Sequence, residues 1–336
     1  MPDRMPAEWE PHRRTWMSWP TRNATFQDAA ELAAARTAWA AVANTIQRYE
    51  PVSMLVNLGD DTGDLLHPGI EPVWVPLDDA WLRDSGPTFV HTGDGELGAV
   101  DWTFNGWGAQ SWAKWDLDAE LAGAVAATVG VRAEASPLTQ EGGGFHVDGK
   151  GTVLLTETVQ LDPYRNPGWN AERVESEIHA RLGTSRAIWL PRGLTADYGE
   201  FGTRGHVDIV AAFTPPGRVL VHTQTDPGHP DHAVSQEVTA ILRDAGREVT
   251  ELLAPAVTEV DGELVDWSYV NHYVANGVVV LCGFDDPRDD DAARVLAGAY
   301  PGRHVVTVDA RDIFRFGGGI HCITQQQPLA PTGENP

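Results

Sequence analysis

The sequence predicts an α/β protein made of repeated units, each combining a β-hairpin, a helix and a further strand. Short β-branched segments bounded by turn residues alternate with segments of helical periodicity, and this order recurs about five times at about 65 residues per unit. The 34 glycines and 23 prolines are spread along the chain, which is typical of many turns. Because no change in composition marks a linker, we expect residues 5–330 to form one domain.

The elements follow an aromatic-rich segment over residues 5–22. Helical spacing of apolar side chains predicts helices over residues 28–49, 118–129, 171–182, 231–245 and 289–299. β-Branched segments predict strands over residues 52–58, 73–76, 88–90, 98–103, 152–157, 186–190, 205–213, 218–222, 248–252, 269–273, 277–282 and 305–308. Repetition of such units around a centre would place functional sites at a shared axis.

Composition and charge exclude several kinds of partner. The chain has 336 residues and a formal net charge of −24 at pH 7. Nucleic acid and anionic membranes both require a basic patch, so we expect neither as a partner. The negative field favours a small cationic ligand, although acidity also serves solubility alone. The chain has only two cysteines, and it shows neither a signal peptide nor an apolar run of ~18 residues, so we expect a soluble cytoplasmic protein. A homo-oligomer is compatible with the sequence.

A glycine-rich segment near the end of the chain, residues 316–328, carries the most informative pattern. Three consecutive glycines, Gly317 to Gly319, permit positive φ and close approach of a ligand, so we expect Gly319 among the substrate-binding residues. Cys322 follows this turn, where its thiol is well placed to act as a nucleophile. A buried cysteine acting as a small apolar side chain is the alternative, and the segment alone favours neither.

His206 and Asp208 are two residues apart on a predicted strand, so both side chains should point to the same face. An apolar core does not readily accept a histidine and a carboxylate together. The pair is therefore either a mutually satisfied polar contact or an acid/base group beside a carboxylate that binds substrate.

Two more carboxylates lie next to turn signals. Asp84 precedes Ser-Gly-Pro, which fits a plain turn residue or a carboxylate at the mouth of a strand, with Trp81 as an aromatic wall for a cation. Glu141 stands before three glycines and is either a surface loop residue or a group that orients a histidine.

The histidine-rich loop at His222, His229 and His232 is a candidate metal site that the sequence disfavours. Metal ligands converge from rigid elements, whereas this stretch is rich in Pro and Gly and leads into a helix. A solvated loop is the preferred interpretation, and no motif for nucleotide or zinc binding is present.

The assembled motifs make the chain similar to the agmatine deiminase family, also described as bacterial-type peptidylarginine deiminases. The resemblance covers nearly the whole chain and rests on WLRDSGPT (81–88), EGG (141–143), HVDG (146–149), RNP (165–167), GHVD (205–208) and GGGIHCITQQQP (317–328). The family implies a five-bladed α/β propeller, the pentein fold, with pseudo-five-fold symmetry. It also implies hydrolysis of a guanidinium group with no metal and no cofactor.

Matched position by position, the resemblance implies roles for five side chains. Cys322 corresponds to the nucleophile and His206 to the general acid/base, with Glu141 as the carboxylate that polarises this histidine. Asp84 and Asp208 correspond to the pair that grips the guanidinium. These residue types suit the chemistry, because two carboxylates can bind the N–H edges of a planar cation and hold its carbon against a thiolate.

The sequence departs from the family pattern just before the GHVD motif. Arg204 stands where an Asn is usual and Gly202 where an Asp is usual. If the strand begins this early, Arg204 shares a face with His206 and would contact the far end of the substrate. It would then disfavour agmatine and favour a guanidino acid, unless it pairs with an acid of the chain itself.

Several activities remain open at this stage. Deimination of agmatine is preferred, with deimination of another guanidine and amidino transfer as alternatives. A non-catalytic guanidinium-binding protein would need only the two aspartates, and a metal-dependent hydrolase would need the histidine-rich loop.

Overall fold

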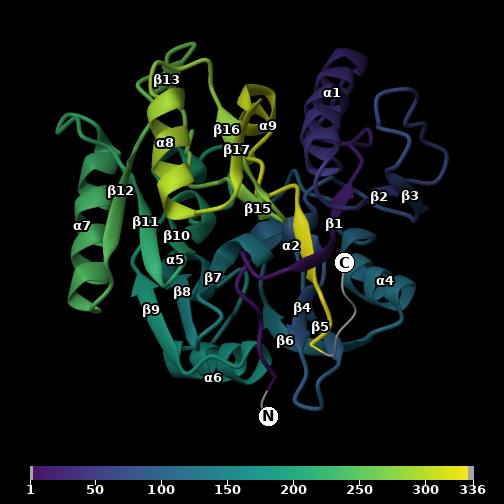
Figure 1. Cartoon of the computed structure of the whole chain (residues 1–336), viewed down its shortest axis with the longest axis horizontal. Helices are drawn as coiled ribbons and strands as arrows, with labels where there is room; N and C mark the ends of the chain where they lie inside the picture. Colours follow the sequence, from purple (N-terminus) through teal and green to yellow (C-terminus); the bar gives the residue numbers. More distant parts are fainter. Residues whose placement is uncertain (1–2, 332–336) are drawn as a thin grey trace.

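The computed structural model describes residues 3–331 and has the mixed α/β architecture that the sequence predicts. Figure 1 shows the long helices at the periphery of the molecule and the sheets inside them. These helices are α1 (Ala29–Ile46), α4 (Leu121–Val129), α6 (Ala171–Leu182), α7 (Pro230–Asp244) and α8 (Asp289–Ala299). Among residues 3–331, none of the helices is both long and apolar enough to cross a membrane.

Four sheets share one plan, in which a hairpin is followed by a helix and then by a third strand parallel to the second. This is the predicted order of hairpin, helix and strand. The four sheets are β4 (Thr88–His91), β5 (Leu97–Thr103) and β6 (Arg132–Thr139); β7 (Phe145–Val147), β8 (Thr152–Thr156) and β9 (Arg186–Leu190); β10 (Ala211–Thr214), β11 (Arg218–Thr223) and β12 (Val249–Leu253); and β15 (Tyr273–Ala275), β16 (Val278–Gly283) and β17 (His304–Asp309).

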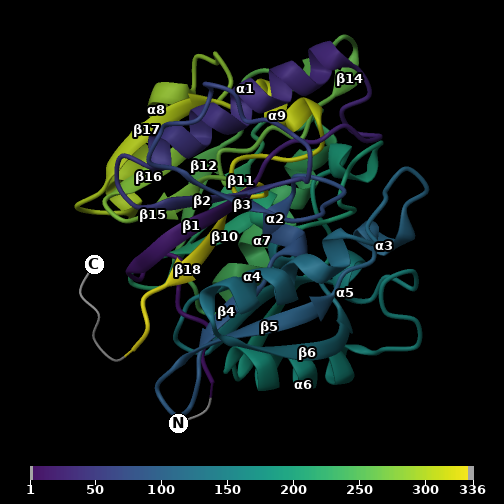
Figure 2. The ribbon, with the colours of Figure 1, turned by 90° about the vertical axis from the view of Figure 1, so that its right-hand side faces the viewer.

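A fifth sheet follows the same plan but is built from both ends of the chain. Strand β1 (His12–Ser18) pairs antiparallel with β18 (Gln325–Pro328) and parallel with β2 (Val52–Val56), and β3 (Glu71–Trp74) forms the edge. Figure 2 shows β1 and β18 side by side. The hairpin of this unit therefore has no connecting turn, because its two strands are the first and last of the described chain.

The remaining elements are short and mostly connect the sheets. A two-stranded hairpin, β13 (Glu259–Val260) with β14 (Glu263–Leu264), stands apart from the five sheets. The short helices are α2 (Leu82–Ser85), α3 (Gly106–Ala109), α5 (Glu157–Gln160) and α9 (Arg311–Arg315), and the 3-10 helices are η1 (Asp118–Glu120), η2 (Gly142–Gly144), η3 (Ala196–Tyr198) and η4 (Val207–Ile209).

Local sequence explains the regular elements well. Helix α1 begins after Asp28, whose carboxylate accepts backbone N–H groups while Glu31 bonds back to complete a capping box. Strand β16, the middle strand of its sheet, is buried along its whole length because α1 and α8 pack against it and its side chains lie in the core, which accounts for its continuous apolar sequence. Strands β1, β6 and β18 were not predicted, because their sequences contain charged residues, glutamines or proline.

The prediction of one strand over residues 205–213 is wrong in its first half. Arg204 has φ 67° and Gly205 has φ 120°, and the chain then turns through η4 before β10 begins at Ala211. The amide of Gly205 donates to the Asp197 carboxylate instead of joining a strand ladder. The alternation argument that placed Arg204, His206 and Asp208 on one face therefore fails.

Candidate active site

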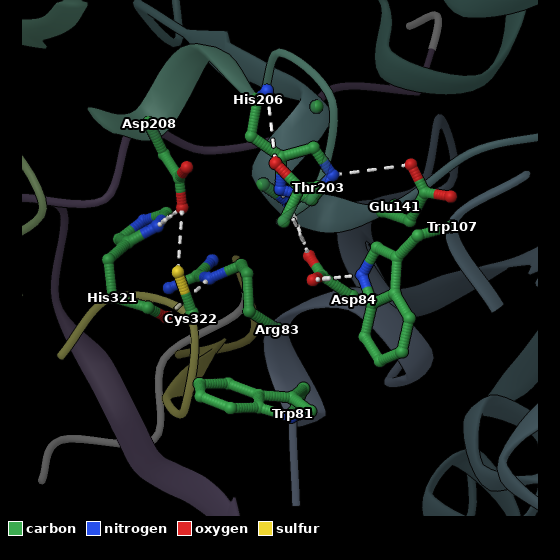
Figure 3. A network of polar contacts seen from close by, with 12 residues as sticks. Trp81, Arg83, Asp84, Trp107, Glu141, Thr203, His206, Asp208, His321 and Cys322 are labelled. Atoms are coloured by element: carbon green, nitrogen blue, oxygen red, sulfur yellow. Dashed lines mark hydrogen bonds and ion pairs between the residues drawn. The ribbon is translucent and has the colours of Figure 1, made fainter. Parts of the chain in front are cut away.

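Five of the predicted side chains meet in one buried cluster: Asp84, Glu141, His206, Asp208 and Cys322 (Figure 3). They come from α2, the segment before η2, the residue before η4, η4 itself, and the turn before β18. Each is at most 4% exposed to solvent. Ionisable groups are rarely buried together at this density unless they serve a function, so this cluster is the candidate active site.

Cys322 lies at the floor of the cluster. Its thiol is 3.7 Å from Asp208 Oδ2, and Asn271 Nδ2 donates to the sulfur at 3.3 Å. Burial, followed by the nearby Asp208 and Asp84 carboxylates, raises the pKa of this thiol well above its ordinary value. The sulfur is therefore a protonated thiol when no cation is bound, and a cationic ligand beside it would favour the thiolate.

His206 is placed by a tight loop folded around Asp197. The Asp197 carboxylate accepts hydrogen bonds from the backbone and side chain of Thr203 and from the amide of Gly205. The His206 amide in turn donates to Thr203 Oγ1 at 3.2 Å. The polar Thr–Arg–Gly sequence before the histidine therefore forms a structured turn, and this turn aims the imidazole into the site.

The charge of His206 is set by three carboxylates. His206 Nε2 lies 3.3 Å from Glu141 Oε2, and Nδ1 lies 3.8 Å from Asp84 Oδ1. Burial alone would lower the pKa of His206, but Asp84, Glu141 and Asp208 outweigh burial and raise it to about 9. Glu141 stays ionised because Arg165 Nε donates to both of its oxygens at 3.0 Å, which offsets the effect of burial and holds the pKa of Glu141 low.

Asp84 is held by one donor on each oxygen. Trp107 Nε1 donates to Oδ2 at 2.9 Å, and the Gly143 amide donates to Oδ1 at 3.0 Å. A side chain at position 143 would not fit, because its Cβ would lie 2.4 Å from His206 Nδ1 and 3.0 Å from Asp208 Oδ2. The glycine run that follows Glu141 is thus needed for close approach of the backbone to the cluster.

Asp208 is bound on one side only. His321 Nδ1 lies 2.7 Å from Oδ2, while Oδ1 is buried with no hydrogen-bond partner among the described residues. His206 Nδ1 is likewise buried and has no partner in this part of the chain. An unpaired buried donor and an unpaired buried acceptor in one cluster are costly unless a ligand satisfies them, so both atoms indicate where a polar ligand would bind.

The three further residues predicted to bind substrate have different surroundings. Trp81 is buried edge-on against Trp39, with ring centroids 5.3 Å apart, and a Cβ on Gly318 would lie 2.8 Å from the Trp81 ring. Gly319 has no room for a side chain, because its Cβ would lie 2.3 Å from Asn271 Oδ1. Arg204 is half-buried and forms no ion pair within residues 3–331, so the alternative in which it pairs with a neighbouring acid does not hold.

The histidine-rich loop does not form a metal site among residues 3–331. His229 caps α7, His232 bonds the carbonyl of Gln224, and His222 bonds Ser268. A different group has the spacing of metal ligands, namely Glu8, His146 and His321, and it is buried beneath the cluster.

Sequence reasoning missed the residues that hold the cluster in place: Glu8, Arg83, Trp107, Arg165, Asn271 and His321. Arg83, Arg165 and His321 stand inside the quoted motifs, so a search for partners of the carboxylates could have found them. Asn271 lay in a segment predicted to be a strand, whereas β15 begins only at Tyr273. Glu8 carried no local signal.

The fold and the cluster together define an α/β protein with a buried Cys–His–carboxylate site, and comparisons with known proteins agree on its family. The profile of the Porphyromonas-type peptidyl-arginine deiminase family matches residues 4–328, and the chain belongs to this family. It is 60% identical over 335 residues to a putative agmatine deiminase of Streptomyces avermitilis, covering 97% of each chain. It is 39% identical to an agmatine deiminase of Stutzerimonas stutzeri, covering 96% of this chain and 95% of that one.

Solved structures give the same result. The fold superposes with a TM-score of 0.89 on a structure described as agmatine deiminase of Enterococcus faecalis catalyzing its reaction. That protein is 31% identical to this chain, and the match covers 97% of this chain and 96% of the other.

Proposed function

We propose that this chain is a hydrolase that deiminates a small guanidino compound and releases ammonia and a ureido product. Agmatine is the preferred substrate, which would give N-carbamoylputrescine. The observation that carries the proposal is the buried thiol of Cys322 between two carboxylates, with a free acceptor on Asp208 and a free donor on His206. The names of the similar proteins support agmatine within this class.

Binding and activation are coupled in this proposal. The Asp84 and Asp208 carboxylates accept N–H groups from the planar guanidinium and fix its carbon against the sulfur. Burial, followed by the Asp208 and Asp84 carboxylates, holds the Cys322 pKa high, and the bound cation offsets the carboxylate charge, so the thiol releases its proton to solvent once substrate is present. Substrate binding thereby produces the nucleophile.

Chemistry then proceeds in two halves. The thiolate attacks the guanidinium carbon, an S–C bond forms, and the C–N bond breaks as His206 gives a proton to the departing ammonia. An amidino group remains on Cys322 as a thiouronium. Water, deprotonated by His206, attacks the same carbon, the S–C bond breaks, and the ureido product leaves. The scheme needs no metal and no cofactor.

The overall architecture is part of the same proposal. We propose that the five sheets are the blades of a pentein propeller with pseudo-five-fold symmetry, and that residues 5–330 are one domain. The repeated strand order and the peripheral helices in Figure 1 support this arrangement. The candidate site draws on segments before β7, β10, β15 and β18 and on α2 before β4, as expected for a site at a common axis. Trp81, Arg204 and Gly319 are proposed to line the substrate path in a cytoplasmic enzyme.

The test is ammonia release by the purified chain from agmatine, arginine, guanidinobutyrate and a simple alkylguanidine. We expect agmatine to have the highest kcat/KM. Cys322→Ser should lose turnover by at least about 10³-fold. It should still bind agmatine in calorimetry, because the Asp84 and Asp208 carboxylates that bind the guanidinium remain. Cys282→Ser is the matched control, since Cys282 is equally buried but its sulfur donates only to the Asn271 carbonyl.

Each result has a distinct meaning. If no guanidine yields ammonia, or Cys322→Ser stays near full activity, the proposed reaction is wrong. If a guanidino acid is preferred and Arg204→Asn shifts the preference toward agmatine, Arg204 contacts the far end of the substrate and the proposed substrate is wrong.

A further inference from the structure

Beneath the candidate site, His321 lies between two carboxylates. Its Nδ1 is 2.7 Å from Asp208 Oδ2, and its Nε2 is 2.8 Å from Glu8 Oε2 (the Asp208 contact is drawn in Figure 3). Ionised carboxylates only accept hydrogen bonds, so both ring nitrogens must carry protons for both contacts to form. His321 is therefore an imidazolium, bound at both nitrogens and only 4% exposed.

Glu8 is itself fixed in place. Its Oε1 accepts the amide of Val274 at 2.8 Å, and Arg83 Nη2 lies 3.7 Å from Oε2. Glu8 stands before β1, His321 before β18, and Asp208 on η4, so three distant segments of the chain meet in this row of charges. Glu8, His321 and Asp208 each have a charged partner, while Asp208 Oδ1 and Arg83 Nη2 are buried with no hydrogen-bond partner among the described residues.

We infer that Glu8 and His321 are positioning residues that hold the substrate-binding carboxylate of Asp208, an inference that rests on the proposed function. The Glu8-bound imidazolium fixes Asp208 through Oδ2, the oxygen that also lies 3.7 Å from the Cys322 sulfur, so that the carboxylate is held ionised and in place beside the nucleophile. Neither Glu8 nor His321 contacts the substrate; both act through Asp208.

Electrostatics agrees with this geometry. Burial would raise the pKa of Asp208, but the hydrogen bond and the charge of His321 outweigh burial and lower it. Burial and Arg83 would lower the pKa of His321, but Glu8 and Asp208 outweigh them and raise it. The charged and titratable groups around this pair are Glu8, Arg83, Asp84, His146, His206, His272 and Cys322.

A metal ion is the competing occupant, because Glu8, His146 and His321 offer ligand atoms within 4.8 Å of one another. The contacts disfavour it. A cation there would lie next to the Arg83 guanidinium, and ligation by His321 would cost a proton and with it one of its two carboxylate contacts. His146 already accepts the amide of Phe213 through Nδ1.

The test is the pH dependence of agmatine deimination by Glu8→Gln. Glutamine keeps the size and can still hydrogen-bond, but it removes the charge that holds His321 protonated. We expect kcat/KM to fall about 10- to 100-fold, and its acid limb to move up by about one pH unit, because Asp208 then protonates more easily. Glu50→Gln is the matched control: Glu50 forms a similar buried pair with His12, remote from Asp208.

The outcomes separate the inference from the proposed function. An inactive wild-type chain refutes the proposed function, whereas an active wild-type chain whose Glu8→Gln profile does not move, or moves as much as that of Glu50→Gln, overturns the inference. Stoichiometric metal whose removal by a chelator abolishes activity also overturns it. If Glu8→Gln does not fold, ¹⁵N-histidine NMR of the wild-type decides: an imidazolium at His321 well above the ordinary histidine pKa supports the inference, and a neutral ring contradicts it.

Discussion

At the scale of single residues, the protonation of His206 depends on its neighbours rather than on its own type. Asp84 and Glu141 keep it charged at neutral pH even though it is fully buried. A charged imidazole can deliver a proton to departing ammonia, and the unpartnered Nδ1 is the atom available for this step. Deimination should therefore require protonated His206, and kcat/KM should fall as the pH rises through about 9.

Glu141→Gln tests this assignment. Removing one of the carboxylates that raise the His206 pKa should move the alkaline limb of kcat/KM downward by roughly one pH unit. Asp162→Asn is the control, because Asp162 also binds Arg165 at 2.9 Å and its ion pairs do not include His206. An alkaline limb that stays in place in Glu141→Gln would rule out His206 as the group that titrates there.

At the scale of elements, the Trp-rich strap over residues 105–115 covers Asp84. Within this strap, the four residues of α3 (Gly106–Ala109) have φ between 53° and 82°, so this turn is left-handed. Trp107 and Ala109 are not glycines, and each such residue costs about 1–2 kcal/mol. The strap is held by the Trp107 bond to Asp84, by stacking of Trp107 on Trp112, and by Gln110 donating to the Gly202 carbonyl. Strain of this kind is typical of functional segments.

Trp107→Phe removes the indole donor to Asp84 and keeps an aromatic ring in the strap. We expect kcat/KM for agmatine to fall about 5- to 30-fold, equivalent to about 1–2 kcal/mol for one buried hydrogen bond to a carboxylate. Trp112→Phe is the control, since its indole donates to Gln110 and not to Asp84. Equal losses in the two variants would show that the strap matters only through packing.

At the scale of the whole molecule, the pairing of β1 with β18 joins the chain ends beside the site. Arg83 Nη1 donates to Gln326 Oε1 at 2.7 Å, and Trp16 Nε1 donates to Gln327 Oε1 at 2.9 Å. Arg83 also forms an ion pair with Glu8, so one side chain connects the closure of the fold to the residue that binds His321. Stability and activity should therefore be linked at this seam.

Gln326→Ala leaves one donor of the buried Arg83 unsatisfied. The free energy of unfolding should decrease by about 1–3 kcal/mol in denaturant titrations. Gln27→Ala, at an exposed glutamine near the start of α1, should change it by less than about 0.5 kcal/mol. A neutral Gln326→Ala would mean that Arg83 finds another acceptor and that the seam is not held by this contact.

The α/β class, the repeated hairpin, helix and strand, the bounds of α6 and α8, and the five side chains of the cluster could all be predicted from the sequence. Such prediction is possible because apolar periodicity and turn residues act locally, and because the motifs around Cys322 and His206 are distinctive. The groups that surround these five side chains, by contrast, become evident only in the folded chain. Glu8 reaches His321 only because β1 pairs with β18, and Asn271 reaches the Cys322 sulfur from 51 residues earlier in the chain. Such contacts join residues far apart in sequence, where no local pattern records them.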